Sequence, residues 1–351
     1  MIRKFLLPLV PIYRIIIQLR NRWYNFQNER LFKAAVPVIS IGNISTGGTG
    51  KTPMTEYALK WGLAEGLQLA YLSRGYGRKT KGFFEVNPDK HTSLDVGDEA
   101  LQIAKKFSAV LVSVCEDRRE GIRRIQDDFQ VELILLDDAF QHRKVQRSLD
   151  LIMIDANRLP WKDYLLPAGN LREPLQNISR ADGIVVNKLR KNHDLGAIRN
   201  RLQKFKLPIA FTQPAIQVAQ HFFSDRTHLL KDLSGTSCFV FSGIANPYFF
   251  EYQLREFQMT LVGTRQFPDH YTYQKRDVGL IYEAFIRLSK NSSTFGSPLI
   301  LTTEKDYFRL RNMDWMSTFK DLPFFYVPMS LDWIEGEGEI VRLMKHTITH
   351  F

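Results

Sequence analysis

Residues 36–52 read VPVISIGNISTGGTGKT, and this stretch decides the fold. The apolar run at 36–41 predicts a buried strand, the glycines after it a tight turn, and a helix is expected from about Thr52. A strand, a Gly-rich turn ending in GKT and a helix are typical of a phosphate-binding loop. Glycines let successive backbone N–H groups turn toward phosphate oxygens, and the helix N-terminus favours the same anion.

In a loop of this kind the lysine, here Lys51, reaches the β- and γ-phosphates, and the next hydroxyl, here Thr52, holds Mg²⁺. Ser45 stands where the first glycine of the loop is usual. The sequence therefore predicts a nucleotide site with phosphoryl chemistry. The expected nucleotide-binding residues of the loop are Ser45, Thr46, Gly47, Gly48, Thr49, Gly50, Lys51 and Thr52.

A second acidic element is expected at the end of a strand. The apolar run at 131–136 is followed by Asp137 and Asp138. An acid pair after a strand also suits a helix cap or a turn. Together with the phosphate loop, however, it predicts carboxylates that hold Mg²⁺ directly or through water. Which of the two is the inner ligand stays open.

Further apolar runs alternate with helical patterns, and this alternation predicts a parallel sheet with helices on both faces. The runs cover residues 70–72, 110–114, 131–136, 149–154 and 183–186, with helical patterns at 99–107 and 118–127. A second set follows a mixed stretch at 207–233, with strands at 238–242 and 298–303 and a helix at 278–289.

We therefore expect an α/β chain in which a phosphate-loop core is joined to a smaller α/β domain. The expected parts are an amphipathic helix at 1–30 that belongs to the first domain, the core at 31–210, the smaller domain at 211–335, and a C-terminal helix at 336–351 whose domain is left open.

The composition excludes several classes of protein. The chain has 351 residues, of which 44% are hydrophobic and 24% charged, so disorder, collagen-like repeats and a polytopic membrane protein are excluded. Cys115 and Cys238 are its two cysteines, too few for a disulfide framework or a cysteine-rich zinc site. The formal net charge of +11 suits an acidic partner. No zinc-ligand pattern, aromatic RNA-binding motif or recognition helix is visible, so nucleic acid is not the expected partner.

The positive charge is concentrated at the N-terminus. Residues 1–33 hold seven basic residues against Glu29 alone, mixed with bulky apolar side chains. No apolar run there reaches the ~20 residues that span a bilayer. Two interpretations stay open: a helix lying in the membrane interface, or an ordinary amphipathic helix packed on its own domain. On a helical projection Ile12, Ile16, Leu19 and Trp23 share one face with Arg20 at its side, and Arg14, Gln18, Asn21 and Arg22 share the other.

Eight motifs follow one another along the chain: GGTGKT, SRGYGR, GDE, DDAFQHR, NLREP, SGIANP, FPDHYTY and TTEKD. With this set the sequence resembles the tetraacyldisaccharide 4'-kinases, also called lipid A 4'-kinases, from the N-terminal helix to about Leu310. Two departures are small. Ala139 replaces the glycine of the family's DDGFQH stretch, and Tyr271 replaces the second histidine of a frequent His-His pair.

The resemblance implies an enzyme that uses ATP and Mg²⁺ to phosphorylate the 4'-hydroxyl of a tetraacyldisaccharide 1-phosphate. The product would be lipid IVA, in lipid A (lipopolysaccharide) biosynthesis. It also implies a peripheral protein on the cytoplasmic face of the bacterial inner membrane. Its partners would be an anionic glycolipid and the membrane surface, and we expect a monomer.

The resemblance also suggests roles for particular residues. Asp98 is the candidate base for the acceptor hydroxyl, with His270 beside it to orient or tune the carboxylate. Because His270 belongs to the second domain, the pair requires the domains to approach each other. Arg118 and Arg172 are candidate phosphate clamps, since a guanidinium fork matches phosphate geometry. Glu99 is a candidate member of the Mg²⁺ shell. The role of Glu304-Lys305-Asp306, structural or toward the nucleotide, stays open.

The main competing interpretation is a membrane-associated switch ATPase of the chromosome- or septum-positioning type. Such proteins also combine a GG-x-GK[ST] loop with amphipathic helices. Their loop carries a signature lysine directly before the GG pair, and this sequence has Thr46 there. A switch ATPase would hydrolyse ATP and ignore a glycolipid, so ATP turnover with added acceptor separates the two.

Overall fold

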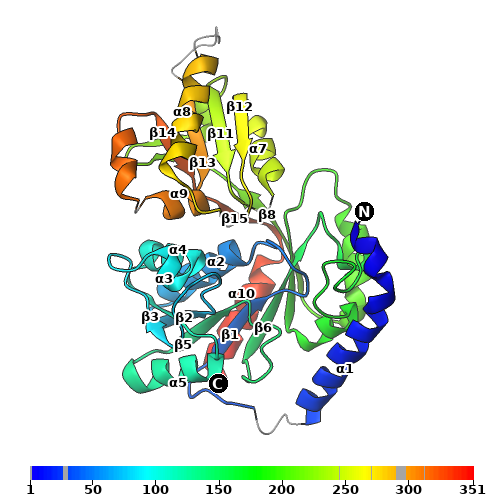
Figure 1. Cartoon of the computed structure of the whole chain (residues 1–351). Coiled ribbons are helices and arrows are strands. Elements are labelled where there is room, and N and C mark those ends of the chain that lie inside the picture. Colours follow the sequence, from blue (N-terminus) through cyan, green and yellow to red (C-terminus); the bar gives the residue numbers. More distant parts are fainter. Residues whose placement is uncertain (1, 27–30, 245, 270, 290–297, 312) are drawn as a thin grey trace. The chain divides into compact units, whose positions relative to one another are not determined.

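The computed structural model describes all residues except 1, 27–30, 245, 270, 290–297 and 312, and it divides the chain into two compact units (Figure 1). Unit 1 comprises Met1–Pro214 and Leu331–Phe351, and unit 2 comprises Ala215–Ser330. The second unit is thus shorter at both ends than the expected 211–335, because β8 (Ile209–Ala215) and β15 (Ser330–Glu335) extend the sheet of unit 1. The C-terminal helix, left open by the sequence, belongs to unit 1.

Unit 1 is built on a nine-stranded sheet with the order β15-β8-β7-β6-β1-β5-β2-β4-β3. The strands from β8 to β4 in this order pair in parallel, and β3 is antiparallel to β4. The remaining strands are β1 (Val38–Gly42), β2 (Leu69–Ser73), β3 (Phe84–Glu85), β4 (Leu111–Val114), β5 (Leu133–Asp137), β6 (Leu149–Asp155) and β7 (Gly183–Asn187). Because β1 lies between β5 and β6, the polar residues after these strands meet at one edge of the sheet.

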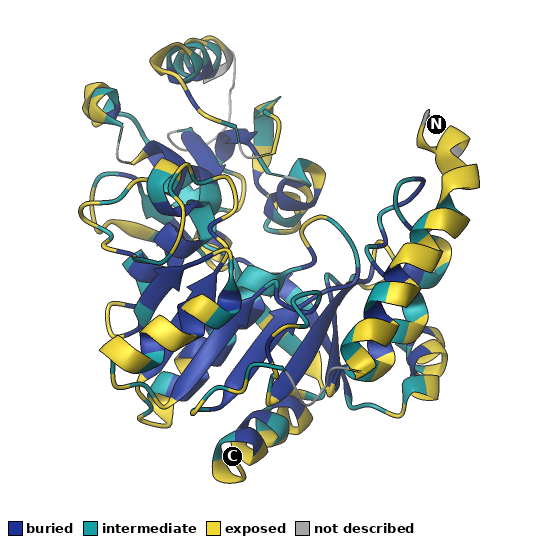
Figure 2. Ribbon diagram, turned by 60° about the horizontal axis from the view of Figure 1, so that its bottom comes forward, coloured by how far each residue is buried: buried dark blue, intermediate teal, exposed yellow. Residues whose placement is uncertain are grey.

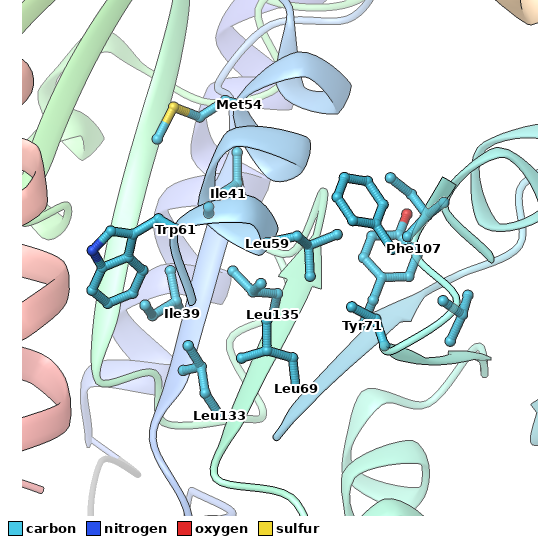
Figure 3. Packing of buried hydrophobic residues seen from close by; sticks show 14 of the residues in the cluster. Ile39, Ile41, Met54, Leu59, Trp61, Leu69, Tyr71, Phe107, Leu133 and Leu135 are labelled. Atoms are coloured by element: carbon cyan, nitrogen blue, oxygen red, sulfur yellow. The ribbon is translucent and has the colours of Figure 1, made fainter. Parts of the chain in front are cut away.

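Alternate residues of the strands pack on opposite faces of the sheet. On one face Ile39 and Ile41 of β1 pack with Met54 and Leu59 of α2 (Figure 3). On the other face, residues of β1, β2 and β5 pack with Ile122 of helix α5. The helices of unit 1 are α1 (Val10–Phe26), α2 (Lys51–Ala64), α3 (Ser93–Val96), α4 (Asp98–Lys106), α5 (Arg118–Asp128), α6 (Leu195–Leu202) and α10 (Glu337–Thr349), with 3-10 turns η1 (Ile2–Leu9), η3 (Pro160–Lys162), η4 (Leu175–Arg180) and η5 (Gln203–Phe205). The predicted parallel sheet with helices on both faces is confirmed.

Helix α1 turns its apolar side outward (Figure 2). Ile12, Ile16 and Leu19 are 57%, 57% and 58% exposed. The side that docks on the unit instead carries Ile17, Arg20 and Asn21, with Ile17 and Asn21 buried. This corrects the helical projection, which put Arg20 beside the apolar face and Asn21 on the open cationic face.

Unit 2 has a six-stranded sheet with the order β10-β9-β14-β13-β11-β12. The four strands from β14 to β12 are parallel, and β9 and β10 join in antiparallel fashion. The predicted strands at 238–242 and 298–303 and the helix at 278–289 are present. The elements are β9 (Val218–His221), β10 (Thr227–Leu229), β11 (Ser237–Ser242), β12 (Thr260–Gln266), β13 (Leu299–Thr303), β14 (Phe324–Val327), α7 (Pro247–Glu256), α8 (Lys275–Ser289), α9 (Glu304–Leu310), η6 (Leu230–Leu233) and η7 (Asp314–Phe319).

Candidate active site

The predicted phosphate loop connects the end of β1 to the start of α2. Gly50 caps α2 in the left-handed conformation, with φ 93°. A Cβ at Gly50 would lie 1.8 Å from Nδ2 of Asn187, so a larger residue there would displace the Asn187 side chain. The loop residues 45–50 therefore close onto the helix N-terminus, where Lys51 and Thr52 form the first turn.

Side chains from the neighbouring strand ends hold the loop by its carbonyl groups. Asn187 donates from Nδ2 to the Thr49 carbonyl at 3.3 Å, and the Lys188 ammonium donates to the Gly48 carbonyl. Lys188 also pairs with Asp155 at 2.9 Å. With these carbonyls occupied, the backbone of the loop is fixed before a phosphate arrives, which lowers the entropic cost of binding.

The sequence did not lead us to Asn187, Lys188 or Asp155 as site residues. Each stands at or directly after the end of a buried strand: β6, which is next to β1 in the sheet order, or β7, which is next to β6. Polar residues in that position were the available signal. Asn187 and Lys188 are hard to recognise because they bind main-chain carbonyls, which every residue carries. Asp155 in turn binds Lys188.

Asp138 joins the two cations of the site. Its carboxylate lies 3.6 Å from Nζ of Lys51 and accepts from Nη1 of Arg172 at 2.9 and 3.0 Å. Burial acts to raise the pKa of Asp138, but Lys51 and Arg172 outweigh it and hold that pKa below its usual range. Asp138 has φ 47°, an uncommon value for a residue other than glycine. A strained residue between two cations is typical of a functional site.

Asp137, the last residue of β5, has the opposite electrostatic environment. It is 4% exposed, and Oδ2 accepts from the Tyr71 hydroxyl at 3.2 Å. Oδ1 has no hydrogen-bond partner among the described residues. Burial, supported by the Glu99 carboxylate, raises the pKa of Asp137 to about 7. A buried carboxylate oxygen without a partner is costly unless a ligand, a water or an ion satisfies it.

The GDE motif lies beside the loop. Glu99 accepts from the Thr52 hydroxyl at 3.4 Å. Asp98 is half-buried and begins α4. A Cβ at Gly97, which has φ 88°, would lie 3.1 Å from Gly75 of the SRGYGR loop. The phosphate loop, the GDE motif and the SRGYGR loop thus lie side by side in unit 1.

These residues fit Mg²⁺, which is usually held by one or two carboxylates together with waters and substrate phosphates. Thr52, Glu99 and Asp137 supply a hydroxyl and two carboxylates at the loop, and the orphaned Oδ1 of Asp137 is an oxygen of the kind that Mg²⁺ prefers. Within the described part of the chain, no group of three or more His, Cys, Asp and Glu residues is arranged to hold a metal by itself. A nucleotide-dependent Mg²⁺ does not require one.

Arg118, one of the two expected phosphate clamps, is held by main-chain carbonyl groups. It is 4% exposed, and its guanidinium donates to the Cys115 carbonyl at 2.8 Å and to the Asp137 carbonyl at 3.1 Å. Burial lowers its pKa, and Asp137 opposes that shift. In this structure Arg118 ties the ends of β4 and β5 together. Arg172, the other expected clamp, lies at Asp138 as described above.

In unit 2 the TTEKD, SGIANP and FPDHYTY motifs share one buried network. Asp306 is fully buried and accepts from the Gly243 amide at 3.1 Å, from the Tyr273 hydroxyl at 2.9 Å and from the Thr303 hydroxyl at 2.6 Å. Arg309 donates to Asp306 at 3.2 Å. The network gives Asp306 a structural role in joining three motifs. His270 lies outside the described residues.

The fold and the site together define a P-loop protein built for phosphoryl transfer from a nucleotide. A parallel sheet presents a GKT loop, and acidic and cationic side chains gather at the same edge.

Comparisons with known proteins narrow this class. The family model of the tetraacyldisaccharide-1-P 4'-kinases matches residues 2–349. The chain belongs to this family, and it is a kinase. It is 35% identical to the tetraacyldisaccharide 4'-kinase of Chlorobium limicola, over 97% of each chain. It is 39% identical to that of Bacteroides fragilis, over 88% of this chain and 83% of the relative.

A solved structure shares the whole fold. LpxK from Aquifex aeolicus, crystallised in a form described as "apo" and in complex with ATP, matches with a TM-score of 0.76 and 29% identity. The match covers 99% of this chain and 100% of that one.

Proposed function

We propose that this protein transfers the γ-phosphate of ATP to the 4'-hydroxyl of a tetraacyldisaccharide 1-phosphate, giving lipid IVA for lipid A biosynthesis. One observation carries the proposal: in a chain of this family, Lys51 and Arg172 meet Asp138 at 3.6 and 2.9 Å beside a phosphate loop. Cations at that position suit the β- and γ-phosphates of a nucleotide, and the relative from Aquifex aeolicus was crystallised with ATP.

The loop and its lysine provide the binding half of the reaction. The backbone N–H groups of the loop and the N-terminus of α2 hold the phosphates, with Lys51 on the β- and γ-oxygens. Arg172 is bound to Asp138. When ATP is bound, its guanidinium would contact the same phosphates as well as Asp138. Thr52, Asp137 and Glu99 would hold Mg²⁺, which when bound neutralises charge on the phosphate oxygens. We assign Asp137 as the inner ligand, because both cations already occupy Asp138.

The acceptor half of the reaction rests on Asp98 and His270. A sugar hydroxyl is a poor nucleophile, so a kinase orients it and takes its proton as the new bond forms. Asp98 would accept that proton, and His270 would orient or tune the carboxylate. The two residues belong to different units, so their joint action requires the units to approach during the reaction.

We also propose that the protein works on the cytoplasmic face of the inner membrane, attached through α1. In the described part of the chain, no helix combines the length and apolar character needed to cross a bilayer. The outward side of α1 is nevertheless apolar: Ile15, Ile16, Leu19 and Trp23 are each more than half exposed. Exposed Arg14 lies on the same helix. An outward apolar face with flanking cations suits the interface of an anionic membrane.

The proposed partners are therefore the anionic glycolipid and the membrane surface, with the protein acting as a monomer and without nucleic acid. The +11 charge suits both partners, because the substrate and the leaflet are negatively charged.

The proposed reaction is tested by measuring ATP consumption with different acceptors in mixed micelles. We expect turnover to rise when tetraacyldisaccharide 1-phosphate is added and to stay at its basal level with DNA or RNA. Lys51→Ala, which removes the phosphate-binding ammonium, should abolish the glycolipid-dependent part. ATP hydrolysis that ignores the glycolipid would instead indicate a switch ATPase.

A further inference from the structure

Helix α1 makes polar as well as apolar contacts with the rest of unit 1, and two of the polar contacts reach the surroundings of the phosphate site. The Tyr13 hydroxyl donates to the main-chain carbonyl of Arg172 at 2.9 Å. The Arg20 guanidinium donates to the main-chain carbonyl of Gln141 at 2.6 Å. Both contacts are partly shielded from water, which strengthens them relative to exposed hydrogen bonds.

The two residues that α1 holds are hydrogen-bonded to each other, and one of them, Arg172, also binds the Asp138 carboxylate. Nη1 of Arg172 binds Asp138 and also donates to Oε1 of Gln141 at 3.3 Å. Nε2 of Gln141 donates to the carbonyl of Asn43, at the start of the phosphate loop, at 2.7 Å. Asp138 lies 3.6 Å from Lys51. A chain of direct contacts therefore runs from α1 to the lysine that binds phosphate.

The segment 170–172, whose Arg172 carbonyl Tyr13 contacts, is also hydrogen-bonded to the phosphate loop through its backbone. The Arg172 amide donates to the Ile44 carbonyl at 2.8 Å, and the Thr46 amide donates to the Asn170 carbonyl at 2.8 Å. One side of this short segment thus pairs with the phosphate loop, and its Arg172 carbonyl receives the hydroxyl of Tyr13. The Tyr13 contact therefore bears on the loop through the Arg172 segment itself.

We propose that α1 is part of the frame of the phosphate site as well as a membrane anchor, with Tyr13 and Arg20 as positioning residues for Arg172 and Gln141. The inference rests on the proposed function only in calling this site an ATP site. The two tasks of α1 use different sides of the helix. Ile16 and Leu19 face outward, whereas Tyr13 and Arg20 face the core, so α1 can engage a membrane and support the site together.

The chain contains a matched control on the same helix. Nη2 of Arg143 donates to Oδ1 of Asn25 at 2.7 Å, near the end of α1. This hydrogen bond also fastens the helix to the core, but Asn25 has no described contact with Arg172, Gln141 or Asp138. Asn25→Ala therefore loosens α1 without touching the proposed path.

The test compares Tyr13→Phe, Arg20→Gln and Asn25→Ala in the full-length protein, using titration calorimetry with ATP and Mg²⁺ in detergent without acceptor. We expect the first two variants to raise the Kd for ATP by about five- to tenfold, the range of one lost hydrogen bond. Asn25→Ala should stay close to wild type. Arg20→Lys, which keeps a donor, should recover part of the affinity. In the transfer assay, KM for the glycolipid and vesicle binding should be unchanged.

Two results would overturn the proposal: an ATP Kd within about twofold of wild type in both Tyr13→Phe and Arg20→Gln, or an equal loss in Asn25→Ala. Tyr13→Phe removes a single oxygen, and Arg20→Gln provides an independent variant if either protein folds poorly. Because ATP binding needs no acceptor, the outcome is separate from the proposed reaction. If wild type fails to phosphorylate the glycolipid but the ATP affinities change as expected, the positioning role stands and the acceptor assignment is wrong.

Discussion

Two adjacent residues, Asp137 and Asp138, have opposite electrostatic environments. Burial raises the pKa of Asp137 to about 7, while Lys51 and Arg172 keep the pKa of Asp138 below its usual range. Neighbouring carboxyl groups whose pKa values are pushed apart usually have different tasks. Here Asp138 holds two cations in place, and Asp137 presents the unsatisfied oxygen that we assign to Mg²⁺.

His142, in the DDAFQHR motif, should make stability depend on pH. Burial, with Arg118 nearby, lowers the pKa of His142 to about 4 from the usual 6.5. Below pH 6.5 His142 is protonated in the unfolded chain but remains neutral in the folded protein until the pH approaches 4. The free energy of unfolding should therefore fall between pH 6.5 and 4, by up to ~1.4 kcal/mol per pH unit from this group.

Urea denaturation of the wild type and His142→Gln at pH 7.5 and pH 5 measures this effect. We expect the variant to lose less stability than the wild type on acidification. An identical loss in both proteins would show that His142 is not the group responsible.

At the level of secondary structure, α1 shows where prediction from sequence ends. Its helical pattern and apolar stripe were visible in the sequence, and both interpretations of that stripe were reasonable. The docked side could not be predicted, because Arg20 and Asn21 find their partners, Gln141 and Glu173, more than 100 residues away. A polar side chain looks solvent-exposed in a sequence unless its distant partner is known.

Other parts of the chain show the same difference between features that local sequence encodes and features that depend on distant contacts. The phosphate loop and the acid pair were predictable, because their chemistry depends on local order: a strand, glycines, GKT, and a strand ending in Asp. Strand β9 and strand β12 were missed, because both are largely half-exposed and lack a continuous apolar run. The contacts of Lys188 were missed because they are made to carbonyls of the loop.

We expect the outward face of α1 to govern membrane binding. Ile16→Glu combined with Leu19→Glu places two charges on the exposed apolar side and should strongly reduce sedimentation with vesicles that contain anionic lipid. Gln18→Glu adds a like charge at an exposed polar position of the same helix and serves as the control. Full vesicle binding by the double variant would contradict the membrane role of α1.

At the scale of the whole molecule, the proposed reaction draws on both units. Unit 1 carries the phosphate loop and Asp98, and the FPDHYTY motif with His270 belongs to unit 2. The buried network around Asp306 joins this motif to two others through the Tyr273 hydroxyl. This network holds the FPDHYTY motif in place within unit 2.

We therefore expect Asp98→Asn and His270→Ala to share one kinetic signature. Both should lower kcat for transfer, by about 100-fold or more for the base, because general base catalysis contributes on that order. Both should leave the Kd for ATP near wild type, since neither residue belongs to the phosphate loop. Steady-state kinetics together with ATP titration separates the two quantities. A defect confined to ATP binding would assign His270 a structural role.

The proposed reaction is the phosphorylation of one specific hydroxyl of an acylated disaccharide. It is tested most directly by incubating the protein with labelled ATP, Mg²⁺ and tetraacyldisaccharide 1-phosphate in mixed micelles, and then locating the new phosphate by fragmentation mass spectrometry. We expect a bisphosphorylated product with the label on the 4'-position, and no such product with Lys51→Ala. Label released only as inorganic phosphate, or placed on another hydroxyl, would contradict it.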